Sequence, residues 1–196
     1  MKGNAVGYQD IKGWFNFEDI YRDAVRDAPK GATLVEVGVF FGRSLAFLAR
    51  EAIDQGRDDL TIIGVDPWEF GSPHPDADVE EILREACGDS YMAFESCMAE
   101  HAVQERRRVS LRRERSVDAA RNSPAWRVPP WFVFVDADHS YEGVKADIAA
   151  WLPLMAKGGI LAGHDYDPQF PGVIKAVDEA FGPGKAAPPS SWRVRL

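Results

Sequence analysis

Residues 33–44 read Thr-Leu-Val-Glu-Val-Gly-Val-Phe-Phe-Gly-Arg-Ser, a short apolar run followed by two glycines and the start of a helix-like segment. The run predicts a strand over Thr33–Val37, and the apolar spacing after it predicts a helix over Arg43–Gln55. Gly38 and Gly42 lie between them, where glycines let the backbone turn tightly and approach a ligand closely. The stretch therefore predicts a strand–loop–helix unit with a ligand at its loop, with a plain turn without a ligand as the simpler alternative.

Strands and helices alternate along the rest of the chain. Further strands are predicted at residues 60–65, 108–111, 131–135, 159–162 and 192–196, and further helices at 79–105, 142–155 and 173–181. The pattern predicts an α/β fold with an open, mostly parallel Rossmann-like sheet and helices on both faces. Ligands in such folds bind beyond the carboxyl ends of the strands, so chemistry is sought in the residues that follow each strand.

Composition limits the class of protein. The chain has 196 residues, which fits a single domain spanning 1–196, and its net charge is −8. A surplus of acids disfavours a nucleic-acid partner, because such binding depends on clustered Lys and Arg. Six arginines fall within residues 106–115, but Val109 and Leu111 alternate with the charges, which favours an outer strand. We find no membrane-spanning run and no secretory leader, and we therefore expect a cytoplasmic protein without a membrane partner.

The second strand ends in Gly64-Val65-Asp66-Pro67-Trp68. A carboxylate only accepts hydrogen bonds, and Asp66 at this strand end is suited to hold the two hydroxyls of a ribose. Trp68 is suited to cover an adenine or the ribose. In the alternative interpretation, Asp66 caps a turn before Pro67 and has no ligand.

Two later strands end in polar residues, in Val-Asp-Ala-Asp-His-Ser-Tyr (135–141) and Ala-Gly-His-Asp-Tyr-Asp (162–167). Adjacent parallel strands would bring Asp136, His139, His164 and Asp165 into one small volume. Carboxylates and imidazoles gathered there bind a divalent metal or take a proton from a substrate. The alternative is that they cap the helix at 142–155 and order its loop.

A nicotinamide cofactor fits the first loop poorly. The dinucleotide fingerprint G-x-G-x-x-G needs glycines where this chain has Phe40 and Arg43. Glu36, two residues before the first glycine, also suits a positively charged ligand better than a pyrophosphate. A NAD-type oxidoreductase is thus a disfavoured alternative. A non-catalytic cofactor-binding module is the other, and it would not need the polar cluster.

The order E-x-G-x-x-x-G-x-S, V-D-P-W, V-D-A-D-H-S-Y-E-G-V and G-G-I-L-A-G-H-D-Y resembles class I S-adenosylmethionine-dependent methyltransferases. It is most similar to the branch of small-molecule and sugar O-methyltransferases, from about Trp14 to Phe181. The resemblance implies S-adenosylmethionine as cofactor, with Glu36 near the methionyl ammonium, Asp66 on the ribose and Ser116 near the adenine. The predicted cofactor-binding residues are Glu36, Gly38, Gly42, Ser44, Asp66, Trp68, Ser116 and Asp136.

The same resemblance implies roles for the residues of the polar cluster. Asp136 matches the first metal-binding acid of catechol-type O-methyltransferases, and their second and third ligands fall on His164 and Asp165. With His in the set, Mn, Fe or Zn suits the site better than Mg alone. Without a metal, His139 or His164 is the expected base. The predicted catalytic residues are therefore Asp136, His139 and His164.

The remaining expectations concern the acceptor and the chain ends. The resemblance implies in-line methyl transfer to a hydroxyl of a small-molecule acceptor. The N-terminal segment (1–30) is expected to form a lid or helical segment, with Trp14, Phe15 and Phe17 in a lid helix or in the core. A helical insert (76–105) is expected on the substrate side. Residues 182–191 leave room for only one clear closing strand, so the C-terminal hairpin is expected to be shortened or completed by a second copy in a homodimer.

Overall fold

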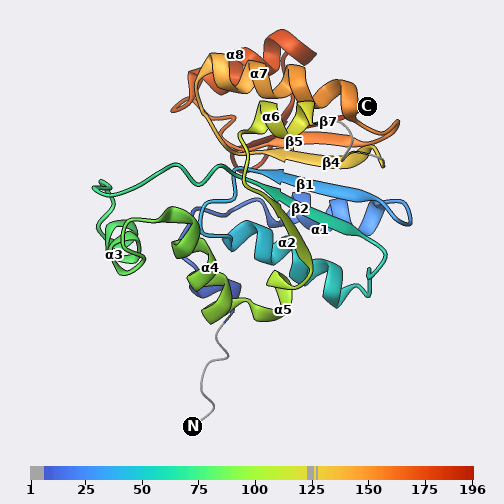
Figure 1. Cartoon of the computed structure of the whole chain (residues 1–196). Coiled ribbons are helices and arrows are strands. Elements are labelled where there is room, and N and C mark those ends of the chain that lie inside the picture. Colours follow the sequence, from blue (N-terminus) through green and yellow to red (C-terminus); the bar gives the residue numbers. More distant parts are fainter. Residues whose placement is uncertain (1–6, 123–125, 127) are drawn as a thin grey trace.

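Seven strands form one sheet in the computed structural model, which describes residues 7–122, 126 and 128–196 (Figure 1). Their order is β3-β2-β1-β4-β5-β7-β6, with parallel pairing from β3 to β5 and antiparallel pairing of β7 with β5 and β6. The strands are β1 (Thr33–Val37), β2 (Thr61–Val65), β3 (Val109–Arg112), β4 (Pro130–Val135), β5 (Ile160–Gly163), β6 (Ala186–Ala187) and β7 (Ser191–Arg195). The predicted open, mostly parallel sheet is confirmed.

Helices cover both faces of the sheet (Figure 1). In Figure 1, α6, α7 and α8 lie above the sheet, whereas α1, α2, α4 and α5 lie below it. The helices are α1 (Glu18–Asp27), α2 (Arg43–Asp54), α3 (Ala77–Glu85), α4 (Ser90–His101), α5 (Val103–Arg106), α6 (Ser116–Arg121), α7 (Tyr141–Trp151) and α8 (Pro171–Phe181). Single 3-10 turns occur at Tyr8–Asp10 and Leu152–Leu154. None of the described helices is long and apolar enough to cross a bilayer.

The alternation of side chains along each strand separates two hydrophobic clusters. In β1, Leu34 packs with α1, α2 and α4 on one face, whereas Val35 and Val37 pack with α7 and α8 on the other. In β4, Phe132 and Phe134 likewise join the first cluster. The central strands are thus buried on both faces, as their continuous apolar sequences indicate. This double burial leaves the carboxyl ends of the strands as the place where polar residues gather.

The arginine-rich segment forms the outer strand β3, which pairs only with β2 in the described sheet. Val109 is buried, and the guanidinium of Arg112 lies over the ring of Trp126, at 4.9 Å from its centre. The prediction of an outer strand is confirmed. Charged side chains on such a strand discourage pairing with another sheet.

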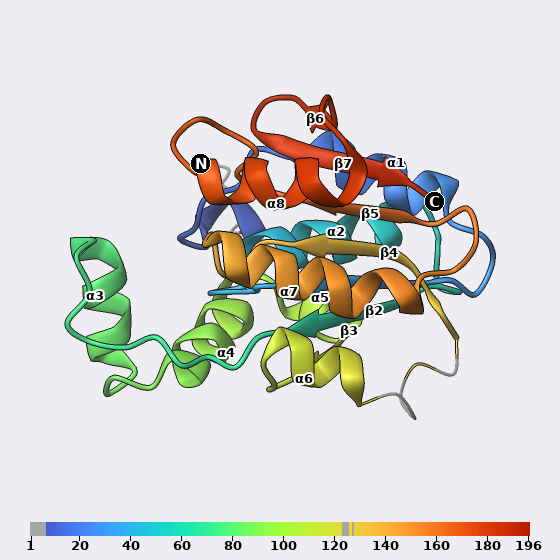
Figure 2. The same cartoon turned by 90° about the horizontal axis from the view of Figure 1, so that it is seen from above.

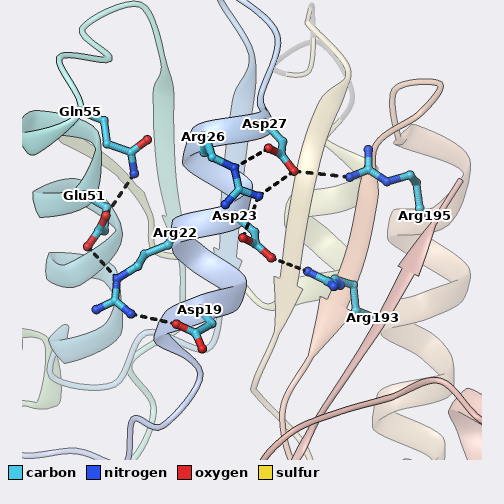
Figure 3. Close-up of polar contacts among 9 residues, drawn as sticks. All are labelled: Asp19, Arg22, Asp23, Arg26, Asp27, Glu51, Gln55, Arg193 and Arg195. Carbon is cyan, nitrogen blue, oxygen red and sulfur yellow. Dashed lines mark hydrogen bonds and ion pairs between the residues drawn. The ribbon is translucent and has the colours of Figure 1, made fainter.

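The C-terminal hairpin is completed within the chain. β7 runs antiparallel to β5 and carries the two-residue strand β6, so the hairpin is short, as expected, and needs no strand from a second copy. Ion pairs join β7 to α1: Asp23 meets Arg193 at 3.0 Å, and Asp27 meets Arg195 at 3.8 Å (Figure 3). Arg22 of α1 reaches Glu51 of α2 at 3.3 Å in the same view. The pairs of Arg193 and Arg195 with α1 are partly exposed to solvent and each contributes little alone, but together they link α1 to the last strand across one face.

The expected lid and insert differ from their predicted forms. Within the described part of the segment 1–30, residues 12–17 form no helix but an irregular strap that leads into α1; residues 1–6 lie outside the described residues. Phe15 and Phe17 pack in the core, whereas Trp14 stays largely exposed. The segment 76–105 is helical, as predicted, but it is interrupted at Gly88 and again at Ala102. Figure 2 shows its first helix, α3, standing apart from the sheet.

The first loop depends on one backbone contact. Gly38 has φ of +87° and donates its N–H to the carbonyl of Val65. A Cβ at Gly38 would lie 1.8 Å from the carbonyl oxygen of Asp136. A Cβ at Gly42, with φ of +96°, would lie 2.7 Å from Sδ of Met98. The two glycines are therefore required by neighbouring parts of the protein, not only by a ligand.

We expect Gly38→Ala to lower the free energy of unfolding by about 3 kcal/mol or more, because neither backbone can move away without breaking the sheet. Gly56→Ala is the matched control, because Gly56 also has a positive φ of +65° but no neighbour within 4 Å of the added Cβ. It should cost only about 1–2 kcal/mol. Urea unfolding measures both, and equal costs would contradict the close approach.

Candidate active site

A cavity of about 1070 Å³ lies beyond the carboxyl ends of β1, β2, β4 and β5. The loops after these strands form its wall together with the strap, the start of α6 and one side of α7. The predicted site residues that line it are Gly38, Ser44, Asp66, Ser116, Asp136, His139, His164 and Asp165. The predicted site residues Glu36, Gly42 and Trp68 are not among the lining residues. The rule that ligands bind beyond the carboxyl ends of the strands thus predicts the place of the cavity. Glu36, Gly42 and Trp68 lie outside its lining for separate physical reasons.

Glu36 lies beneath the cavity floor, almost completely buried. Its carboxyl group accepts hydrogen bonds from Tyr21 Oη and Ser44 Oγ, both at 2.8 Å. Burial raises the pKa of Glu36 to about 8, although the bonds from Ser44 and Tyr21 act in the opposite direction. Ser44 lines the cavity. Glu36 therefore communicates with the cavity through its hydrogen bond with Ser44.

Asp66 holds two loops together. Its Oδ2 accepts the backbone N–H groups of Val39 at 2.8 Å and Phe40 at 3.0 Å, and its Oδ1 accepts that of Trp68 at 2.6 Å. Asp66 therefore fixes the turn, as the alternative interpretation predicts. A carboxylate offers about four lone-pair positions, so about one stays available for a ligand. The ribose contact of Asp66 stays a prediction.

Trp68 is buried, and its predicted place over an adenine or ribose is wrong. Its indole N–H donates to the carbonyl of Phe40 at 2.8 Å, and its ring packs against Tyr91 and Phe94. Gly42 was predicted to line the cofactor site, but it does not line the cavity. Side chains of α4 occupy the space beside it instead. Helix α4 thus packs on the back of the first loop. No residue of this segment is among those that line the cavity.

Ser116 begins α6 and lines the cavity. Its Oγ accepts the indole N–H of Trp151 at 3.0 Å. Asp147 of α7 lies beside it, also lines the cavity and is buried. Burial raises the pKa of Asp147 to about 6, with Ser116 acting in the opposite direction. This end of the cavity was predicted from Ser116 alone, because Asp147 sits within a helix where no motif distinguishes it.

Asp136, His139, His164 and Asp165 converge, as predicted. His139 Nε2 lies 3.0 Å from Asp165 Oδ2 and 3.6 Å from Asp136 Oδ1. His164 Nδ1 lies 3.2 Å from Asp165 Oδ1 and 3.7 Å from Asp136 Oδ1. One oxygen or nitrogen from each of Asp136, His139 and Asp165 lies within 4.8 Å of the others. The group that is shaped for a metal thus contains His139 where the sequence predicted His164.

Both ring nitrogens of His164 have polar partners. Its Nε2 lies 3.0 Å from Asn16 Oδ1 in the strap and 3.0 Å from Ser190 Oγ before β7. Asn16 and Ser190 could not be predicted from the sequence, because they come from distant parts of the chain and belong to no motif. The imidazole therefore ties the strap and the C-terminal loop to the cluster.

The charges of the cluster balance one another. Burial would raise the pKa of Asp136, but its contacts with His139 and His164 lower it. Burial would lower the pKa of His164, but its contacts with Asp136 and Asp165 raise it to about 9. The contact with Asp136 also raises the pKa of His139. Imidazoles and carboxylates in such contact form a group that can exchange protons at the cavity wall.

Two residues of the cavity wall have strained backbones. Phe40 has φ of +55° and Asp165 has φ of +57°, values that side chains other than glycine rarely adopt. Such strain persists where surrounding structure enforces it and concentrates at functional sites. Here Asp66 accepts the N–H of Phe40, and the two imidazoles hold the carboxylate of Asp165.

The comparisons with known proteins agree with this arrangement. A family profile described as a methyltransferase domain matches residues 35–166, which include the ends of β1, β2, β4 and β5. The chain belongs to this methyltransferase family. S-adenosylmethionine is accordingly the methyl donor. A comparison with curated protein sequences finds no match.

Solved structures resemble this methyltransferase in fold. The TDP-rhamnose 3′-O-methyltransferase CalS11 of calicheamicin biosynthesis has a TM-score of 0.59 at 21% identity, over 91% of this chain and 76% of its own. A Bacillus cereus O-methyltransferase in complex with SAH has a TM-score of 0.53 at 17% identity, over 89% and 72%. An rRNA-methylase candidate from Clostridium thermocellum has a TM-score of 0.61 at 13% identity, over 95% and 100%. At these identities the likeness shows the fold alone.

The cavity of the methyltransferase fits its donor in size and charge. Pockets for ligands of this kind enclose about 300–1,000 Å³, so a cofactor and a small acceptor fit together. The lining carboxylates outnumber the lining Lys and Arg side chains, which suits the sulfonium and ammonium of S-adenosylmethionine. The acids are Asp66, Glu69, Asp118, Asp136, Asp138, Asp147, Asp165 and Asp167; the bases are Lys12, Arg43 and Arg115.

Glu36→Gln tests the buried carboxyl group. The folded-state pKa of Glu36, about 8, lies above the unfolded value of 4.5. Its contribution to stability is thus complete below pH 4.5 and falls by about 1.4 kcal/mol per unit as pH rises toward 8. We expect Glu36→Gln to match the wild type at pH 5 and to be more stable at pH 8, in urea unfolding. A variant that is less stable at pH 8 would show that the carboxyl group is charged when buried.

Proposed function

We propose that this methyltransferase transfers a methyl group to a hydroxyl of a small molecule or sugar. The observation that supports this most directly is the convergence of Asp136, His139, His164 and Asp165 on the cavity wall. The cluster adjoins the first loop, because the carbonyl of Asp136 touches Gly38. An acceptor hydroxyl there would meet proton-accepting groups beside the donor's loop.

The chain's own residues would act by positioning and by proton transfer. When bound, S-adenosylmethionine supplies an electrophilic methyl group on a sulfonium that departs as a thioether. The first loop and the cluster hold the two reactants at a fixed separation, which lowers the entropic part of the barrier. As the acceptor oxygen bonds to carbon, its proton passes to His139 or to a carboxylate of the cluster, because the raised pKa of His164 keeps that imidazole protonated.

A small acceptor fits the cavity better than a nucleic acid does. The wall is acidic, and phosphates would be repelled there. Phe170 packs edge-on against His139, with ring centres 5.0 Å apart, so an apolar surface adjoins the proton-accepting groups. CalS11 is described as a TDP-rhamnose 3′-O-methyltransferase, so a protein of this fold methylates a sugar hydroxyl. A homodimer and a cytoplasmic location stay predictions from the sequence.

The cluster also fits a divalent metal. Two carboxylate oxygens and one imidazole nitrogen within 4.8 Å of one another form a donor set that suits Mn, Fe or Zn. Asp136, His139 and Asp165 would hold the ion. It would supply a Lewis acid that favours the oxyanion form of the acceptor.

Manganese titration by calorimetry tests this donor set without turnover. We expect the wild type to bind one Mn²⁺ and Asp136→Asn to weaken binding by about tenfold or more. Asp138→Asn is the matched control, because Asp138 lines the same cavity outside the three-donor group. A wild type that does not bind Mn²⁺ leaves His139 or a carboxylate of the cluster as the base, and a chelator should then leave turnover unchanged.

Methyl transfer itself is tested by calorimetry followed by an acceptor screen. We expect S-adenosylmethionine and S-adenosylhomocysteine to bind with roughly micromolar affinity, about −8 kcal/mol, and NAD not to bind. Hydroxylated small molecules and sugars are then incubated with the donor, and mass spectrometry detects the addition of one methyl group. Tight NAD binding without a response to the donor would contradict the proposal. Methylation of nitrogen or carbon alone would contradict its hydroxyl specificity.

A further inference from the structure

Arg43 is a cation in the cavity wall with unused hydrogen-bonding capacity. It is the first residue of α2 and is half-buried. Its Nη1 donates to the carbonyl of Gly13 at 2.9 Å. Its Nε is buried and has no partner among the described residues. A buried donor without a partner is costly, so a ligand atom that accepts from it would relieve that cost.

The other basic side chains of the wall differ from Arg43. Lys12 pairs with Asp76 and Asp78, and Arg115 pairs with Glu69. Within residues 7–122, 126 and 128–196, no carboxylate lies within 4.0 Å of the Arg43 guanidinium, although the cavity is rich in acids. Arg43 is therefore the described lining arginine whose charge is left for a ligand.

The neighbours of Arg43 indicate which ligand group it meets. Ser44, the next residue, contacts the buried carboxyl group of Glu36. An acid and a guanidinium thus flank one stretch of the first loop. This arrangement complements the zwitterionic end of an amino acid, because an ammonium can donate to the carboxyl group and a carboxylate can accept from the guanidinium. A guanidinium binds a carboxylate through two parallel hydrogen bonds.

We propose that Arg43 binds the α-carboxylate in the methionine part of the donor, an inference that rests on the proposed function. The strap contributes to the same contact. The backbone of Gly13 lies against the aliphatic stem of Arg43, and a Cβ at Gly13 would lie 3.6 Å from Arg43 Cβ. The strap thereby holds the guanidinium on the cavity side of α2. An acceptor that carries a carboxylate is the other source of the same chemistry.

Calorimetry with two ligands tests the contact independently of turnover. We compare S-adenosylhomocysteine with its decarboxylated analogue, which lacks only the carboxylate. The wild type should bind S-adenosylhomocysteine about tenfold or more tightly than the analogue. Arg43→Ala should bind the two ligands within about twofold of each other, because the group that distinguishes them is gone. Arg43→Lys should restore part of the difference, since it keeps the charge but not the paired hydrogen bonds.

Controls separate this role from a merely structural one. If Arg43 only holds the strap, Arg43→Ala weakens both ligands equally and the wild-type ratio persists, which overturns the proposal. Arg115→Ala removes another lining arginine and should keep the wild-type ratio. A wild type that binds both ligands equally also overturns the proposal and leaves the acceptor as the source of a carboxylate. If S-adenosylhomocysteine does not bind at all, the proposed function itself fails.

Discussion

The meeting of two strand ends, where Gly38 touches the backbone of Asp136, is the constraint on which the site depends. β1 and β4 are neighbours in the sheet, and only a residue without a side chain permits this approach at that point. The contact places the loop after β1 and the polar end of β4 on one wall. The donor's loop and the proton-accepting cluster are therefore adjacent because of how the sheet is assembled, before any ligand is present.

Much of the fold could be predicted because local patterns determine it. The apolar run and the two glycines of residues 33–44 predicted β1, its loop and α2, and the polar ends of β4 and β5 predicted the cluster. The reason for the glycines could not be predicted, since it lies in residues distant in sequence: Asp136 for Gly38 and Met98 for Gly42. The buried position of Trp68 could not be predicted for the same reason. Its chemistry suits a ligand, but α4 offers its ring a better-packed place than the cavity does.

The pKa of each buried acid at the site depends on how deeply the acid is buried and on which side chains pair with it. Glu36 is buried with hydroxyl partners alone, so its neutral form is favoured. Asp136 is paired with imidazoles, so its charged form is favoured instead. Two carboxyl groups at the ends of neighbouring strands thus differ in charge because their partners differ. A sequence motif identifies both as acids, but only the folded chain decides which of them carries a charge.

The contacts of His164 have a consequence for how the enzyme is made. Asn16 and Ser190 meet on one imidazole, although 174 residues separate them along the chain and they also contact each other. Contacts between residues so far apart in the sequence close a long loop, which has an entropic cost. During synthesis the first strands can pair and bury their apolar faces, yet the pocket stays incomplete until residue 190 has left the ribosome. A nascent chain would thus be folded in part long before it could hold its substrates.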